Sequence, residues 1–252
     1  MNNYKYSSEE EKHYLESYDV SQYERPSVTT DIVIFTLDKD DDLNILLIKR
    51  GCHPYKNHWA IPGGFLEVGK ESLDDAAARE LKEETNIDNV YLKQLYTFGE
   101  PNRDPRTTVV SVAYTALVPK ESLNVKAGDD AEDAQLFKIK YDVNGIIFCN
   151  DSINITENDL AFDHNEIIRT AITRLRNRID YEDDAFNLLK DKSSFTISEL
   201  KRIYDSIKNT TLDLPNFRKM FLREYVKTKK VVELDKTILS RGLPTKTYKY
   251  EG

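Results

Sequence analysis

The stretch GGFLEVGKESLDDAAARELKEETNI, residues 63–87, ends in a predicted helix that carries three glutamates within five residues. The glycine pair allows a sharp turn or a close backbone approach. Ser72 is a candidate N-cap, and residues 76–78 are alanines, which are strong helix formers. Asn86 tolerates the left-handed conformation that closes many helices.

Glu80, Glu83 and Glu84 extend the face of this helix that is expected to point inward, together with Ala76 and Ala77. A run of charges usually marks a solvated face, but these acids continue the apolar side of the helix. Carboxylates that face a pocket must be paired or bound to a cation. Magnesium suits them, because it takes carboxylate, phosphate and water oxygens. The pattern therefore favours metal-assisted phosphoryl or pyrophosphate cleavage.

The segments around this helix predict an α+β fold with a mixed sheet. Residues 29–38 and 43–50 read as a hairpin, and residues 8–18 and 163–179 have helical patterns. Further strands are expected at 90–98, 108–118, 134–139 and 145–148.

Residues 63–87 resemble the Nudix box of the MutT/Nudix family, G-x5-E-x7-R-E-U-x-E-E-x-G-U, where U is aliphatic. Two positions depart from it: six residues separate Gly64 from Glu71, and Asn86 stands where glycine is usual. Neither departure touches the R-E-U-x-E-E core. The resemblance implies a Nudix α/β/α sandwich. The matching positions are Gly64, Glu71, Arg79, Glu80, Leu81, Glu83, Glu84 and Ile87.

The same resemblance implies roles for the charged residues of the box. Glu80 and Glu84 would be the principal Mg²⁺ ligands, with Mn²⁺ as a substitute, and Glu71 would be a secondary ligand. Glu83 would bind the metal or help to position or deprotonate water. Arg79 would orient its neighbours, although an ion pair with Asp75 is a structural alternative.

Nudix enzymes split the pyrophosphate of a nucleoside diphosphate joined to another group. The wider sequence from 26 to 179 resembles the branch that handles ADP-ribose and related NAD metabolites. Gly64 and the loop residues Arg103, Asp104 and Arg106 are the candidate substrate contacts, and solvated loop charges are the alternative.

Trp59, Phe65, Tyr55 and Tyr114 could stack on adenine. Aromatic residues beside strands are, however, more often part of a core.

Charge divides the chain in two. Residues 1–184 hold 21 basic and 36 acidic residues, a balance of −15, whereas residues 185–252 hold 15 basic and 8 acidic residues, a balance of +7. This asymmetry indicates an acidic module joined to a basic one. We expect an extension at 1–25, a Nudix domain at 26–182 and a small winged-helix domain at 183–252.

The basic segment has the order helix, helix and hairpin that is typical of a winged helix. It resembles the carboxy-terminal domain of Nudix-related transcriptional regulators of NAD and sugar metabolism, which implies binding to operator DNA. A protein-binding or dimer-supporting module is the alternative. The candidate DNA contacts are Arg218, Lys219, Arg223, Arg241 and Lys246.

Two hypotheses therefore stand. The first is a hydrolase of ADP-ribose, yielding AMP and ribose 5-phosphate, with a winged helix that adds DNA binding. The second is a ligand-sensing regulator with negligible hydrolysis. A purely structural protein would leave the glutamate face unexplained. By analogy with two-fold regulators we expect a homodimer.

The chain has no membrane-length apolar run and no secretory signal, and the sequence predicts a cytoplasmic protein. Its two cysteines and four histidines are scattered and support neither a disulfide scaffold nor a zinc site.

Overall fold

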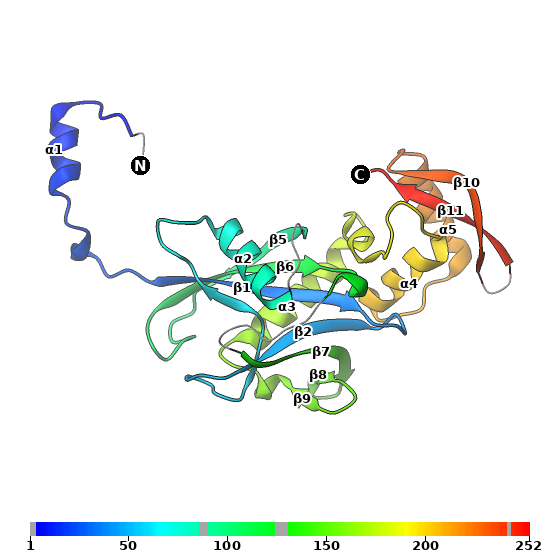
Figure 1. Ribbon diagram of the computed structural model, residues 1–252, viewed down its shortest axis with the longest axis horizontal. Coiled ribbons are helices and arrows are strands. Elements are labelled where there is room, and N and C mark those ends of the chain that lie inside the picture. The colour runs from blue at the N-terminus through cyan, green and yellow to red at the C-terminus, as the bar shows by residue number, and fades with distance from the viewer. Residues whose placement is uncertain (1–3, 86–89, 124–130, 241–242) are drawn as a thin grey trace.

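A computed structural model describes residues 4–85, 90–123, 131–240 and 243–252 (Figure 1). Its centre is a mixed sheet in the order β5-β6-β1-β2-β7-β8-β9, with β3 paired to β2 and β4 paired to β1. Strands β1 and β6 run parallel, and the other pairs are antiparallel. The strands are β1 (Ser27–Leu37), β2 (Leu43–Arg50), β3 (Trp59–Ala60), β4 (Gly63–Phe65), β5 (Leu92–Phe98), β6 (Val109–Leu117), β7 (Ala131–Asp142), β8 (Gly145–Cys149) and β9 (Asn154–Thr156).

Two helices cover opposite faces of the sheet, because the buried side chains of β1 alternate between them. Ile32 and Ile34 belong to the cluster that contains Ala77 and Leu81 of α2 (Leu73–Thr85). Val33 and the other face of β1 belong to the cluster under α3 (His164–Arg178). The predicted α/β/α sandwich with a mixed sheet is thereby confirmed.

Local sequence signals account for where the helices begin. Ser72 Oγ accepts the Asp75 N–H at the start of α2. At α4 (Ile197–Lys208), Thr196 and Glu199 form a capping box, with Thr196 Oγ1 accepting the Glu199 N–H at 3.1 Å. The predicted N-cap at Ser72 is therefore present, and the sequence T-I-S-E marks the start of α4 in the same way.

The carboxy-terminal segment forms the expected winged helix. Helix α5 (Leu214–Phe221) follows α4, and the hairpin of β10 (Val231–Ser240) and β11 (Leu243–Tyr250) follows α5. Helix α5 changes at Leu222 into one π-helical turn, Leu222–Val226. Strand β9 was not predicted, and β7 is longer than the six residues expected from the sequence.

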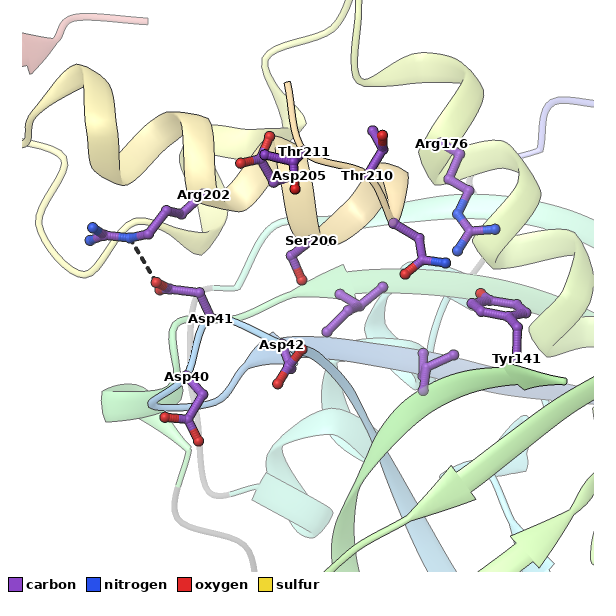
Figure 2. A pocket seen from close by; sticks show the side chains of 13 residues that line it. Asp40, Asp41, Asp42, Tyr141, Arg176, Arg202, Asp205, Ser206, Thr210 and Thr211 are labelled. Atoms are coloured by element: carbon purple, nitrogen blue, oxygen red, sulfur yellow. Dashed lines mark ion pairs between the residues drawn. The ribbon is translucent and has the colours of Figure 1, made fainter. Parts of the chain in front are cut away.

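The two folded units share one apolar core. The cluster under the sheet continues from α3 through a 3₁₀ helix (Asp184–Leu188) into the winged helix. Polar contacts add to this junction: Asp41 in the β1–β2 turn lies 2.7 Å from Arg202 of α4, and Arg176 of α3 donates to the Ile207 carbonyl at 2.9 Å. A cavity of about 420 Å³ lies between these contacts (Figure 2). Strand β1 therefore ends against the winged helix.

Candidate functional site

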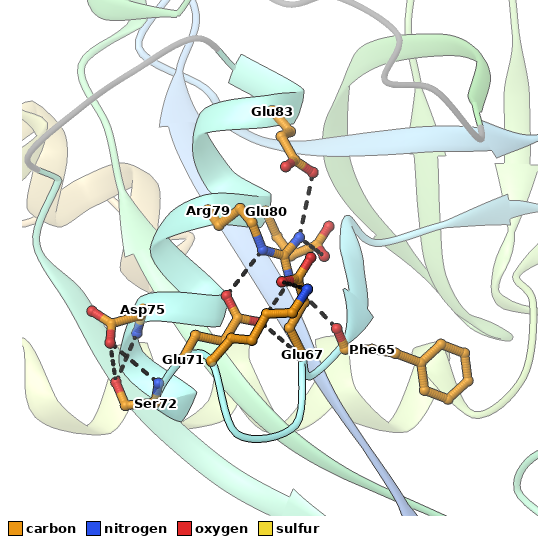
Figure 3. Close-up of polar contacts among 9 residues, drawn as sticks. Phe65, Glu67, Glu71, Ser72, Asp75, Arg79, Glu80 and Glu83 are labelled. Atoms are coloured by element: carbon orange, nitrogen blue, oxygen red, sulfur yellow. Dashed lines mark hydrogen bonds and ion pairs between the residues drawn. The ribbon is translucent and has the colours of Figure 1, made fainter. Parts of the chain in front are cut away.

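Arg79 is the centre of the charged cluster on α2 (Figure 3). Its Nε and one amino group donate to both oxygens of Glu71 at 3.0 and 2.9 Å, and its other amino group donates to Glu80 at 2.7 Å and reaches Glu83 at 3.5 Å. It also donates to the Phe65 carbonyl at 3.4 Å. Arg79 thus fastens the loop before the helix to the acidic face.

The structure corrects the alternative in which Arg79 pairs with Asp75. Asp75 instead accepts the Ser72 N–H and hydroxyl at the start of α2. The Arg79 guanidinium pairs with Glu71 instead of Asp75, and the hydrogen bonds from Arg79 lower the pKa of Glu71 to about 2.

Glu80 lies inside the fold, as the helical pattern predicted, with a relative exposure of 8%. Burial raises its pKa, and the hydrogen bond from Arg79 opposes that rise. Gly64 makes room for it: a Cβ built on Gly64 would lie 2.0 Å from Glu80 Oε1. Gly64 therefore leaves the space that the Glu80 carboxylate occupies.

Glu83 differs from the expected inward orientation, because 56% of its side chain is exposed. The face of α2 that packs on the sheet instead includes Ala77 and Leu81, which are buried. Glu83 therefore lies at the edge of that face. The Glu84 side chain lies outside what the structure describes.

The described residues fit a divalent cation by their donor chemistry. Glu80 is a desolvated carboxylate whose charged form would gain from a cation, and Glu83 lies one turn further along the helix. Both Glu71 oxygens are already engaged by Arg79. Among the described residues no group of three or more acidic, histidine or cysteine side chains is arranged to hold a metal.

The loop that contains Arg103 is built around a buried ion network. Arg103 donates to both oxygens of Asp163 at 2.8 and 2.6 Å, and only 5% of its side chain is exposed. Asp31 on β1 lies 3.6 Å from the same guanidinium and accepts the Ser111 hydroxyl. Arg103 is therefore engaged inside the protein rather than extended from the loop.

Arg106 is the accessible member of this loop, and the buried Asp104 holds its guanidinium. Asp104 is buried and accepts two side-chain hydrogen bonds from Arg106, at 3.0 and 2.8 Å. The Arg106 side chain remains 43% exposed and lies over the Phe65 ring, 5.3 Å from its centroid. Arg106 is consequently the residue of this trio that is best placed to meet an anionic ligand.

The aromatic candidates separate into two groups. Trp59 and Tyr114 are buried in the core at 5% and 3% exposure, which is the alternative stated from the sequence. Phe65 and Tyr55 are partly exposed, and Tyr55 packs on Phe162 at 4.8 Å.

Sequence reasoning missed four residues of this region. Asp31, Asp163 and His164 surround Arg103, and Arg50 lies over Phe162 at 4.9 Å. His164 Nδ1 accepts the Ile61 N–H at 3.0 Å, and burial lowers its pKa. The available signal was a buried strand that contains an acid, Asp31, and an Asp-His pair at a helix start.

The predicted DNA contacts lie on the winged helix. Arg218, Lys219 and Arg223 are exposed on α5 and the turn that follows it, and Arg223 contacts Glu224. Lys246 on β11 forms an ion pair with Glu233 on β10. Arg241 lies outside the described residues. None of the helices in the described part of the chain is long and apolar enough to cross a membrane.

Comparison with family models gives two matches. The NUDIX domain model matches residues 26–141, and the NrtR DNA-binding winged helix domain model matches residues 185–250. Both matches agree with the two kinds of unit found in the structure.

Two relatives carry different functional names. The ADPR responsive transcriptional repressor NtrR of Acinetobacter baylyi is 32% identical over 241 residues, covering 95% of this chain and 88% of the relative. The ADP-ribose pyrophosphatase of Methanocaldococcus jannaschii is 37% identical over 147 residues, covering 58% of this chain and 73% of the relative.

Solved structures resemble most of the chain or its Nudix domain alone. A MutT/nudix family protein from Enterococcus faecalis has a TM-score of 0.77 and 31% identity, covering 98% of this chain and 100% of the other. Shewanella oneidensis NrtR complexed with a 27mer DNA has a TM-score of 0.68 and 28% identity, covering 89% and 93%. The Nudix domain of the same protein complexed with ADP ribose has a TM-score of 0.52 and 31% identity, covering 65% and 97%. The chain belongs to the family of Nudix-domain proteins that carry a carboxy-terminal NrtR-type winged helix.

Proposed function

We propose that this protein is a DNA-binding transcriptional regulator whose Nudix domain binds ADP-ribose and thereby changes the affinity of the winged helix for operator DNA. One observation carries the proposal: a single apolar core connects the domain that holds the Nudix site to the domain that carries the exposed basic helix. The names of the Acinetobacter and Shewanella relatives support it.

The ligand would lie beside the Nudix helix and the loop of Arg106. Arg106 and the exposed ring of Phe65 offer a cation and an aromatic face, which suit a phosphate and a base or ribose. Arg103, held by Asp163, would position that loop rather than touch the ligand. Gly64 would contribute through the space that it leaves for Glu80.

DNA binding would use Arg218, Lys219 and Arg223, with Arg241 and Lys246 in the wing. Like other regulators that read two half-sites, the protein would act as a homodimer in the cytoplasm. The positive balance of residues 185–252 supports contact with phosphates.

Hydrolysis of ADP-ribose is the second candidate function, and the intact glutamates of the box favour it. A bound Mg²⁺ ion would supply charge neutralisation at the phosphates and activation of water. Glu80 and Glu84 would hold the ion, Glu83 at the rim would hold or deprotonate water, and Arg79 would keep Glu80 and Glu71 in place. The name of the Methanocaldococcus relative supports this activity.

DNA binding is tested with the full-length protein and duplexes selected from a random pool. We expect selected duplexes to bind with an affinity that falls steeply as salt rises, since phosphate contacts release counterions. Replacing Arg218 and Lys219 with alanine should remove binding, whereas Lys190→Ala, at an exposed position outside α5, should not. Failure to enrich any sequence would refute the DNA-binding part of the proposal.

Hydrolysis is tested separately by release of AMP from ADP-ribose with Mg²⁺. Wild-type turnover that is lost in Glu84→Gln and Glu80→Gln would support the enzyme. Binding of ADP-ribose without turnover would leave the regulator as the sole function of the site.

A further inference from the structure

The amino-terminal arm, residues 4–25, leaves its apolar side chains without cover. It contains α1 (Glu9–Ser17) and a short turn at Val20–Gln22, and neither element has a buried residue. In Figure 1 the arm extends away from the rest of the chain. Its exposed apolar and aromatic residues are Tyr4, Tyr6, Tyr14, Leu15, Tyr18, Val20 and Tyr23.

The arm has defined contacts among its own residues, although it does not pack on the rest of the chain. Ser8 caps α1 by accepting the Glu11 N–H at 3.1 Å, and the Glu11 carboxylate accepts the Tyr4 hydroxyl. The Tyr14 and Tyr18 rings lie 5.8 Å apart on one side of the helix. Since an isolated helix of nine residues is marginal in water, packing of its aromatic face against a protein surface would stabilise it.

A groove of suitable character lies between β5 and α3. It has a volume of about 700 Å³, and the residues that line it include four cations and no carboxylate. Tyr181 lies at this groove with 70% of its surface exposed. The four cations are Lys93, Arg169, Arg174 and Arg178.

Charge matches the arm to this groove. Residues 4–25 contain six acidic and three basic side chains, a balance of −3. Within the groove, Lys93, Arg169 and Arg178 have carboxylate partners outside the lining. Arg174 donates to the Leu95 carbonyl and has no carboxylate partner in the described part of the chain, so its charge remains available to an acidic segment.

The path of the chain favours the groove of a second copy. The arm joins β1 at Ser27, whereas Lys93 of the groove is in register with Thr115 and so with Val33, six positions along β1. That separation is about 20 Å along the strand, in the direction opposite to the arm. An arm that docked on its own groove would therefore have to reverse its direction after Ser27, which favours a groove supplied by another copy.

We propose that the arm, residues 4–25, docks into the β5–α3 groove of a second copy of this chain, so that two copies exchange arms. Tyr14, Leu15 and Tyr18 enter the groove, and the acidic residues of α1 face its cations. This assignment concerns assembly and is independent of ADP-ribose, hydrolysis and DNA.

Cross-linking between differently labelled copies tests the exchange. In full-length protein with Cys52→Ser, one batch carries His13→Cys, at an exposed position of α1 that is not one of the proposed anchors, and the other carries Thr173→Cys, a groove residue. A short bis-maleimide added to the mixture should join the two batches into a product of twice the chain mass. Val143→Cys, at a 99% exposed site outside the groove, replaces Thr173→Cys as the control and should give no such product.

Two outcomes overturn the proposal. The first is cross-linking only within single chains that carry both cysteines, which would place the arm on its own body. The second is no cross-link in either format. Thermal unfolding of each variant checks that the fold is retained, since all three labelled positions are exposed.

Sedimentation provides an independent measurement. Replacing Tyr14 and Leu15 with serine should weaken self-association about tenfold or more, as expected when interface anchors are truncated. Val143→Ser is the matched surface control. Unchanged association of the Tyr14 and Leu15 variant would contradict the docking mode.

Discussion

Among single residues, Glu80 combines a cost in stability with a capacity for function. Its carboxylate is buried beside Gly64, and burial raises its pKa above the ordinary value of 4.5. The native protein therefore holds a proton there more tightly than the unfolded chain does. Stability from this group is present at low pH and is lost as pH rises from about 4.5 through the raised pKa.

We predict that Glu80→Gln raises the melting temperature at pH 7.5 without divalent cations. The substitution removes a buried charge, whereas the ion pair between Arg79 and Glu71 remains. The difference from the wild type should shrink near pH 4, where Glu80 is protonated. Added Mg²⁺ should stabilise the wild type more than the variant. A variant that melts lower than the wild type at pH 7.5 would contradict this account of Glu80.

The neighbouring glycines make a matched pair of variants. A Cβ on Gly63 would lie 2.4 Å from the Thr30 carbonyl oxygen, whereas a Cβ on Gly64 meets the end of the flexible Glu80 side chain. Gly63→Ala should therefore cost about 1–3 kcal/mol of unfolding free energy. Gly64→Ala should cost less and should displace Glu80, so that Mg²⁺-dependent stabilisation and any hydrolysis decline. Denaturant unfolding and Mg²⁺ titration check both, and equal destabilisation would refute the distinction.

At the scale of elements, two arginines join α4 to the Nudix domain: Arg176 of α3 bonds to the end of α4, and Arg202 of α4 pairs with Asp41 in the β1–β2 turn. Arg176 caps the carbonyl of Ile207 and lies 4.6 Å from the Tyr141 ring centroid. The Arg202–Asp41 pair is about 40% exposed on each side and is therefore largely screened.

Arg176→Leu should accordingly cost about 2 kcal/mol of unfolding free energy, as for a hydrogen bond made by a charged group. Arg202→Leu should cost less than about 1 kcal/mol, the usual limit for an exposed ion pair. Equilibrium unfolding in urea measures both. The reverse order of costs would show that the exposed pair, and not the helix cap, secures the junction.

Elements with local signals were predictable, and contacts between distant residues were not. Ser72 and the Thr196–Glu199 box mark helix starts within four residues of sequence. By contrast, Arg103 was expected to reach a ligand, and its partner Asp163 is separated by 60 positions. The three-residue strand β9 and the π turn after Phe221 depend on tertiary packing and leave no periodic signature.

In the molecule as a whole, the shared core makes the two folded units interdependent. Phe186 of the 3₁₀ helix at the junction is fully buried and stacks on Tyr250 of the last strand at 4.2 Å. We predict one calorimetric unfolding transition for residues 26–252. Phe186→Ala should reduce the free energy of unfolding by about 3–5 kcal/mol and should lower the temperature of that whole transition. Two separate transitions, of which only one moves in the variant, would contradict a common core.

The same continuity is what would allow a ligand in the Nudix domain to affect DNA binding. Strand β1 carries Asp31 beside the candidate ligand site and leads into the turn that contacts α4 through Asp41. A ligand changes DNA affinity only if it binds the two states of the protein differently, and the effect must then be reciprocal.

The measurement that tests the central claim most directly is the affinity of the full-length protein for a selected duplex, titrated at fixed salt with and without saturating ADP-ribose. We predict that ADP-ribose weakens DNA binding by about tenfold or more, within the usual range of allosteric coupling, and that AMP at the same concentration does not. Equal DNA affinity with and without ADP-ribose, under conditions where ADP-ribose is shown to be bound, would contradict the proposed regulator.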